Sequence, residues 1–427
     1  MRLTILATFC VIALASSGAM GANLSEIYQL ARANDAEFAS AEASYRASLE
    51  KLPQGKALLR PSIGLSANLR ENDTDSSGSY GSHQYGLSLS QPLFRKQNLE
   101  TYEQTKLQVL QAEQTLKATE QSMKLRVAQA YFAVLQAQDV LATAQAQKQA
   151  FAEQLAQARK SFEVGASTIT DTHEAQARYD LTSAQEIAAQ NDLEVKRRSL
   201  EKFINRESPE LARLSEDAKL ALPEPNNMDA WVKQAESDSL LVALSQTAQE
   251  VARREVSKQK GGHLPTLDLA ASYGGSRNAA SSTGSTKAGY IGLEFALPLY
   301  QGGATESRVR ESIALQDKAR SDLDNTRRQA RLDARQSFLG VLSGDAQAKA
   351  LGQALISSEA QLKSTKLGLE VGVRTRVDVL NAQQQLFTTK RDLAAARYQT
   401  LVAGLQLKAA AGILKEDDLK TVDALLK

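Results

Sequence analysis

Four segments of the chain alternate between apolar and polar residues. In the first, Ile63, Leu65 and Leu69 fall on one face of an extended chain, with small polar residues between them. A period of two is typical of a β-strand with one apolar face. A length of about ten residues suits a strand that crosses a membrane, although half-buried sheets of soluble proteins show the same pattern. The predicted strands are residues 61–71, 84–94, 265–275 and 288–300.

Four strands are too few to close a barrel in a membrane. About eight are needed, and an open sheet edge is not tolerated in lipid. If the strands cross a membrane, several protomers have to combine them, and three protomers would give twelve strands (3 × 4). Residues 72–81, rich in Asn, Asp, Ser and Gly, are expected to form the loop between the first two strands.

Long stretches of the chain have the pattern of coiled-coil helices. An apolar or small residue recurs at every seventh position from Tyr102 to Ala158. This period predicts a left-handed supercoil, and a helix of about 60 residues would be roughly 90 Å long. Proline, which breaks helices, is absent between Pro92 and Pro209 and after Pro298. The predicted helices are residues 98–164, 168–204, 304–370 and 375–411.

The chain repeats itself at an offset of about 207 residues. Residues 164–171 (Val-Gly-Ala-Ser-Thr-Ile-Thr-Asp) recur as residues 371–378 (Val-Gly-Val-Arg-Thr-Arg-Val-Asp). Each half is expected to run helix, two strands, long helix, turn and helix, so the protomer would be pseudo-symmetric. The predicted divisions are a first repeat at 23–204, a polar linker at 205–227, a second repeat at 228–411 and a tail at 412–427.

The N-terminus has the features of a secretory signal peptide, residues 1–22. Arg2 precedes a short apolar run, and small residues follow it, so we expect cleavage just after Gly21 or Ala22. The apolar run is too short for a membrane anchor. The single cysteine, Cys10, lies inside this segment, so the mature chain would be exported and have no thiol.

The sequence gives no indication of an enzyme. The formal net charge of +2 gives no reason to expect nucleic acid as a partner. The three histidines, His83, His173 and His263, are scattered without metal-ligand spacing. We find no catalytic motif and no phosphate-binding loop. We therefore expect no catalytic residue, no metal and no cofactor.

The repeated segment predicts a helical turn in each half. Gly165 and Gly372 follow long helices, where a left-handed residue commonly ends a helix. The aspartates of the motif are explained as capping carboxylates, which stabilise the start of the next helix. An additional interpretation is compatible with this one: in a symmetric oligomer an inward carboxylate becomes a ring, and such rings select cations. The capping pairs are Thr168 with Asp171 and Thr375 with Asp378.

On these residues the chain resembles the TolC family of outer-membrane efflux and type I secretion proteins. The stretch 371–382 is the most specific part, and the resemblance covers nearly all of the mature chain. It implies a mixed α/β membrane protein in the Gram-negative outer membrane: a homotrimer whose twelve-stranded β-barrel continues as a long α-helical barrel through the periplasm. It also implies outer-membrane lipid, a periplasmic adaptor protein and an inner-membrane ABC or proton-driven transporter as partners.

The resemblance assigns roles to residues of the second turn. Asp378 matches an aspartate that lines a periplasmic entrance ring. Asn381 stands where the type member of the family has a second entrance aspartate, so the ring should carry about half the negative charge. We therefore expect cations to bind in the entrance ring less tightly and to block it less.

The resemblance also implies a gate. Arg374 matches a basic residue that latches the closed state, and its partners fall on Thr170 and Asp171 in the first turn. Leu369 replaces a latch tyrosine and removes one hydrogen bond, which suggests a looser gate. Opening would be an untwisting of the helical hairpins around the two turn glycines.

Two other classes of protein remain open. A periplasmic adaptor also has a long helical hairpin, but it does not repeat the whole helix-strand-strand-helix unit. A secreted coiled-coil structural protein has no need for alternating strands of about ten residues. The sequence does not distinguish export of proteins from export of small toxic compounds.

Overall fold

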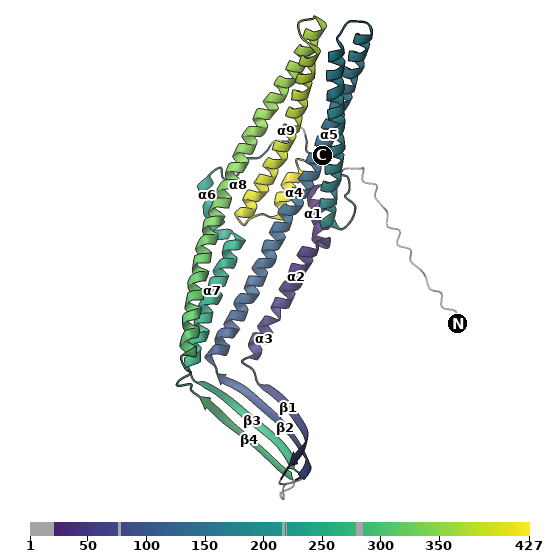
Figure 1. Ribbon diagram of the computed structural model, residues 1–427. Coiled ribbons are helices and arrows are strands. Elements are labelled where there is room, and N and C mark those ends of the chain that lie inside the picture. Colours follow the sequence, from purple (N-terminus) through teal and green to yellow (C-terminus); the bar gives the residue numbers. More distant parts are fainter. Residues whose placement is uncertain (1–20, 76–77, 216–217, 219, 279–284) are drawn as a thin grey trace, which may run out of the picture.

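The computed structural model describes residues 21–75, 78–215, 218, 220–278 and 285–427. The protomer is elongated, with a sheet at one end and two helical hairpins at the other (Figure 1). The C-terminus and the short helices α1, α6 and α10 lie near the middle (Figure 1). The expected signal peptide falls almost wholly outside the described residues, which begin at Gly21.

The order of elements in the first half is repeated in the second. The first half consists of α1 (Leu24–Asn34), α2 (Ala36–Leu49), α3 (Lys51–Ala57), β1 (Ser62–Thr74), β2 (Gly78–Phe94), α4 (Lys96–Glu163) and α5 (Ile169–Ile204). The second half consists of α6 (Met228–Asp238), α7 (Leu240–Lys260), the short 3₁₀ helix η1 (Gly261–His263), β3 (Thr266–Asn278), β4 (Ser285–Ala296), α8 (Ala304–Glu370) and α9 (Arg376–Ala410). A last helix, α10 (Glu416–Asp423), follows.

The four strands form one antiparallel sheet in the order β1-β2-β3-β4. β1 and β4 are therefore the edges within the protomer. The apolar face is open to its surroundings: the side chains of Leu65 and Leu69 are 80% and 85% exposed. A sheet with such a face needs an apolar solvent or a partner to cover it.

The expected loop at 72–81 is wrong. β1 continues to Thr74 and β2 begins at Gly78, with Asn72 opposite Tyr80 and Asp73 opposite Ser79. Residues that favour turns are held in the ladder here because the register of the two strands continues to their tips.

The helices form a curved layer of antiparallel elements. Near the sheet, α2 and α3 pack on α4, and α7 lies between α4 and α8. Toward the hairpin ends, α4 packs on α5 and α9, and α8 packs on α9. The seam expected in α4 is buried in its second half, where Phe151 and Ala158 are fully covered. Within the described residues, no helix combines the length and apolarity needed to cross a membrane.

The largest apolar core lies at the middle of the molecule, where both repeats, the linker and the tail meet. It contains Tyr131, Phe132 and Leu200 together with Leu419 of α10. Tyr398 of α9 packs its ring on Phe132 with centroids 5.8 Å apart. Its hydroxyl donates to the Oδ2 of Asp139 on α4 at 2.6 Å. This contact fixes α9 to α4 at the base of the hairpins.

The linker and both ends of the described chain pair with one another. Ala22 bridges Leu211, and Leu214 bridges Leu426. The single helix expected before the strands of the first half is interrupted at Asp35, whose side chain accepts a hydrogen bond from the Phe38 amide at 2.7 Å and caps α2. An internal Asp is a good N-cap, so one predicted helix becomes several.

Candidate functional site

The two turns predicted from the repeat lie at the ends of the two hairpins, far from the sheet (Figure 1). Gly165 and Gly372 have φ values of 73° and 81°, the left-handed conformation expected after a helix. An added Cβ would meet no atom within 4 Å at either position. The preference for glycine is therefore a backbone effect and not a packing effect.

Both expected capping boxes are confirmed. In the first turn the Thr168 amide donates to the Asp171 carboxylate at 3.2 Å, and the Asp171 amide donates to the Thr168 hydroxyl at 3.3 Å. In the second turn the corresponding Thr375 amide lies 2.8 Å from Asp378 Oδ2, and its hydroxyl also donates to this oxygen, at 2.9 Å. The second box is thus tighter than the first.

The environment of Asp378 favours its ionised form. Hydrogen bonds from the backbone and side chain of Thr375, and the nearby charge of Arg374, lower the pKa of the Asp378 carboxyl below its ordinary value. The carboxylate is nevertheless accessible to water. A charged, accessible carboxylate at this end can act on ions that pass, which a purely buried cap could not do.

Asp378 lies in a polar groove between α8 and α9 with a volume of about 610 Å³. The groove brings together three of the predicted site residues, Arg374, Asp378 and Asn381. The residues of α8 on the opposite wall are Gln361, Ser364 and Thr365.

Gly368 positions Arg374, a role that the sequence pattern did not indicate. The amides of Val373 and Arg374 both donate to the Gly368 carbonyl, at 2.9 and 3.0 Å. A Cβ on Gly368 would lie 2.7 Å from the Arg374 Cγ, so only glycine lets the arginine stem cross the last turn of α8. In the sequence, the position of Gly368 four residues before Gly372 is the only feature that could have indicated this role.

Thr170 and Asp171 lie at the start of α5, on the other hairpin. Among the described residues of one protomer, no hydrogen bond or ion pair joins Arg374 to either of them. The predicted latch is therefore not formed within the protomer and stays a prediction. It requires a neighbouring protomer or a different arrangement of the hairpins.

Two other arginines do join the hairpins, and sequence reasoning missed both. Arg376, at the start of α9, donates to the Ser161 hydroxyl of α4 at 3.2 Å. Arg178 of α5 donates to the Asn381 side-chain oxygen at 3.2 Å. No motif in the sequence pairs these residues, because the contacts depend on how the two hairpins pack.

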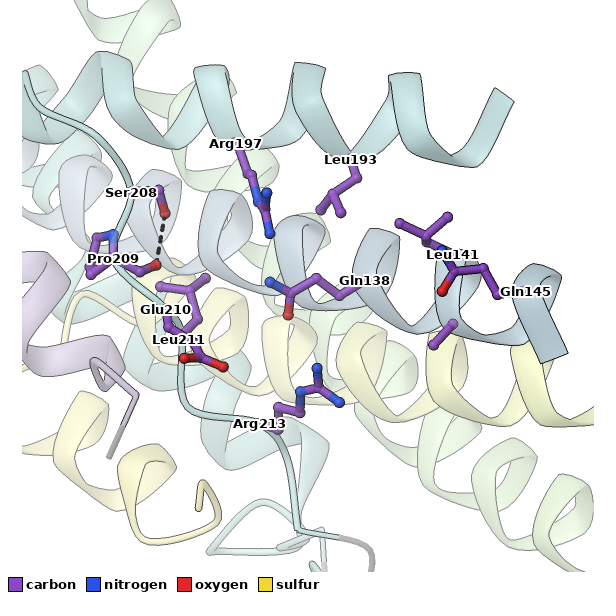
Figure 2. A pocket seen from close by; sticks show the side chains of 11 residues that line it. Gln138, Leu141, Gln145, Leu193, Arg197, Ser208, Pro209, Glu210, Leu211 and Arg213 are labelled. Atoms are coloured by element: carbon purple, nitrogen blue, oxygen red, sulfur yellow. Dashed lines mark hydrogen bonds between the residues drawn. The ribbon is translucent and has the colours of Figure 1, made fainter. Parts of the chain in front are cut away.

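A second hollow lies at the middle of the molecule, where the linker crosses α4 and α5. Figure 2 shows Arg197 and Arg213 pointing toward Gln138 from opposite sides. The volume is about 430 Å³, and both arginine side chains are exposed. Across the described residues, no group of three or more His, Cys, Asp or Glu side chains could hold a metal ion.

Comparison with known proteins gives the family. The profile of the outer membrane efflux protein family matches residues 27–206 and 231–413, one match in each half. The chain is 34% identical over 418 residues to the outer membrane protein TolC of Vibrio cholerae, covering 96% of this chain and 95% of the relative. It is 31% identical over 412 residues to the alkaline protease secretion protein AprF of Pseudomonas aeruginosa, covering 93% and 86%.

Solved structures share the fold. The Campylobacter jejuni CmeC outer membrane channel superposes with a TM-score of 0.79 at 17% identity, covering 100% of this chain and 97% of that chain. The Vibrio cholerae outer membrane protein VceC gives a TM-score of 0.77 at 18% identity, covering 91% and 96%. With two family matches and full-length relatives above 30% identity, the chain belongs to the outer membrane efflux protein family, whose members are channels and not enzymes.

Proposed function

We propose that the protein is an outer-membrane exit duct that works as a homotrimer in a tripartite export system. The observation that carries the proposal is the four-stranded sheet with an exposed apolar face and two unpaired edges. Such a sheet is stable in lipid only when its edges are closed by other strands. Since β1 and β4 run antiparallel, β4 of one copy can continue the ladder onto β1 of the next.

The helical layer supports the same closure. Its two outer sides carry exposed apolar side chains, which a neighbouring copy would cover. On α5 these include Leu181 and Ile187, which is 67% exposed; on α8 they include Leu339 and Ile356, which is 61% exposed. Three copies close the sheet at twelve strands (3 × 4) and continue it as a helical barrel in the periplasm.

The partners follow from the family at a coarse level. Channels of this kind work with a periplasmic adaptor and an inner-membrane transporter, which supply the energy that the duct lacks. The relatives include a protease secretion protein and efflux channels, so secreted proteins and small toxic compounds are both candidate substrates. The ABC and the proton-driven classes of transporter both suit the duct.

The gate lies at the hairpin ends. Arg374, held across Gly368, would bond Thr170 and Asp171 of a neighbouring hairpin in the closed ring, and Asp378 and Asn381 would line the entrance. A charge-assisted bond of this kind is strong enough to hold a turn and weak enough for a partner to replace. Opening is then an untwisting of the hairpins around Gly165 and Gly372.

Membrane fractionation tests the duct. The full-length protein should be found in the outer-membrane fraction, migrate as a heat-modifiable trimer on a gel and form channels in planar bilayers. A monomer in the soluble periplasmic fraction would instead indicate an adaptor-like protein. Soluble filaments without channel activity would indicate a coiled-coil structural protein.

A further inference from the structure

One arginine is held by both repeats at the hairpin ends. Arg178 donates through Nε to the Glu174 Oε1 on its own helix at 3.2 Å and through Nη2 to the Asn381 Oδ1 on α9 at 3.2 Å. At the offset of 207 residues, Glu174 and Asn381 are equivalent positions of the two repeats (174 + 207 = 381). The guanidinium therefore lies between a carboxylate and its neutral counterpart.

The second repeat has no arginine at the matching place. The position equivalent to Arg178 is Gln385 (178 + 207 = 385), which lines the groove with Asp378. The positive charge in hydrogen-bond contact with Asn381 thus comes from the first hairpin. The side chains of Arg178 and Glu174 are 29% and 38% exposed, so the pair stays in contact with water.

The charges around the groove cancel. Arg374 and Arg178 contribute two positive charges, and Asp378 and Glu174 contribute two negative ones. An aspartate in place of Asn381 would leave one excess negative charge in each protomer. With asparagine there, the side chain binds Arg178 without adding charge.

We propose that Arg178 is a selectivity-determining residue of the duct entrance: held on Asn381, its guanidinium offsets the Asp378 ring, so that the entrance admits anionic groups as well as cations. This assignment rests on the proposed duct, in which the α9 face of Asp378 and Asn381 lines the entrance. Asn381 in place of an aspartate already removes one carboxylate from the entrance ring. The assignment adds to this a positive group, Arg178, that acts at the same entrance.

Planar-bilayer recordings in a KCl gradient test the assignment. The wild-type channel should show a potassium-to-chloride permeability ratio near unity. Arg178→Gln should raise this ratio about tenfold, since removing one charge from each of three protomers in a screened, water-filled opening changes the cation and the anion about threefold each, in opposite senses. Arg178→Lys keeps the positive charge and should give the same ratio as the wild-type channel. Arg198→Gln, farther along the same helix and paired with Glu194 and Glu201, is the matched control and should change nothing.

A double-mutant cycle adds a second readout. Asn381→Asp alone should shift the ratio less than its charge suggests, because the new carboxylate meets Arg178 at hydrogen-bond distance. The double variant should shift it by more than the two single variants together.

Two results would overturn the assignment while leaving the duct intact: channels of Arg178→Gln with an unchanged ratio, or fully additive effects of the two substitutions. Trimers on a gel show whether each variant assembles; if Arg178→Gln does not, a shift of the ratio by Asn381→Asp as large as its full charge predicts still refutes the assignment. A wild-type protein that forms no channels would overturn the duct itself.

Discussion

Replacing Asp378 with asparagine separates its two roles. The side chain of Asp378 accepts hydrogen bonds from the amide and hydroxyl of Thr375 at 2.8 and 2.9 Å. Asparagine keeps an oxygen acceptor at the same place, so the start of α9 remains capped. The negative charge is lost, and any effect on ions can then be assigned to that charge.

The size of the effect follows from the groove. The groove, with a volume of about 610 Å³, is large enough for an ion to lie about 7 Å from the carboxylate. At that distance in water one unit charge changes the local ion concentration about 2.7-fold, and screening at 0.15 M salt reduces this to about 1.5-fold. Three equivalent carboxylates in a trimer multiply to about threefold enrichment of the cation and about threefold depletion of the anion, so the cation-to-anion ratio changes about tenfold.

The measurement is the reversal potential of single channels in a KCl gradient, together with block by a trivalent cation such as hexaamminecobalt(III). Asp378→Asn should lower the potassium-to-chloride permeability ratio about tenfold and weaken the block. Asp322→Asn, the same substitution at an exposed carboxylate that pairs with Lys318 farther along α8, is the matched control and should leave the ratio unchanged. If neither the ratio nor the block changes in Asp378→Asn, the residue is a helix cap and nothing more.

Three further predictions concern the gate and stability. Arg374→Gln or Asp171→Asn should raise single-channel conductance by releasing the latch; unchanged conductance in both would exclude it. Burial raises the pKa of Tyr398 and Tyr131, so the stability they contribute is complete below the unfolded value of about 10 and is lost as pH rises above it. Thermal unfolding between pH 9 and about 12 should show this decline, less steep in Tyr398→Phe; an equal slope would contradict it. Gly372→Ala should cost about 1–2 kcal/mol per protomer and Gly372→Asn clearly less, by thermal unfolding, because only the left-handed backbone opposes a side chain there; equal costs would refute this.

Local patterns predicted local structure well where the chain had few alternatives. The glycine and threonine-aspartate motif defined both turns, because a left-handed residue and a capping box need only neighbouring residues. The same reasoning was wrong at residues 72–81, where turn-forming composition suggested a loop. There the hydrogen-bonded register with the neighbouring strand decides the conformation, and composition does not contain that register.

Contacts between the hairpins were beyond the reach of the sequence. Arg178 and Asn381 are separated by 203 residues, and Arg376 and Ser161 by 215. Each is one of many polar residues on a long helix with a wet surface, so no period singles it out. Their pairing results from how α4 and α5 pack beside α9, which depends on the packing of whole helices.

The duplication makes the two turns alike in backbone and unlike in chemistry. Ser161 and Gly368 are equivalent positions (161 + 207 = 368). In the first turn the serine hydroxyl receives Arg376 from the other hairpin, while in the second the glycine leaves room for Arg374 to cross. The arginines Arg374 and Arg376 therefore belong to the second turn, and Ser161, which accepts from one of them, belongs to the first. An exact repeat would place like groups opposite each other, so divergence of the two copies is what allows Arg376 of one hairpin to bind Ser161 of the other.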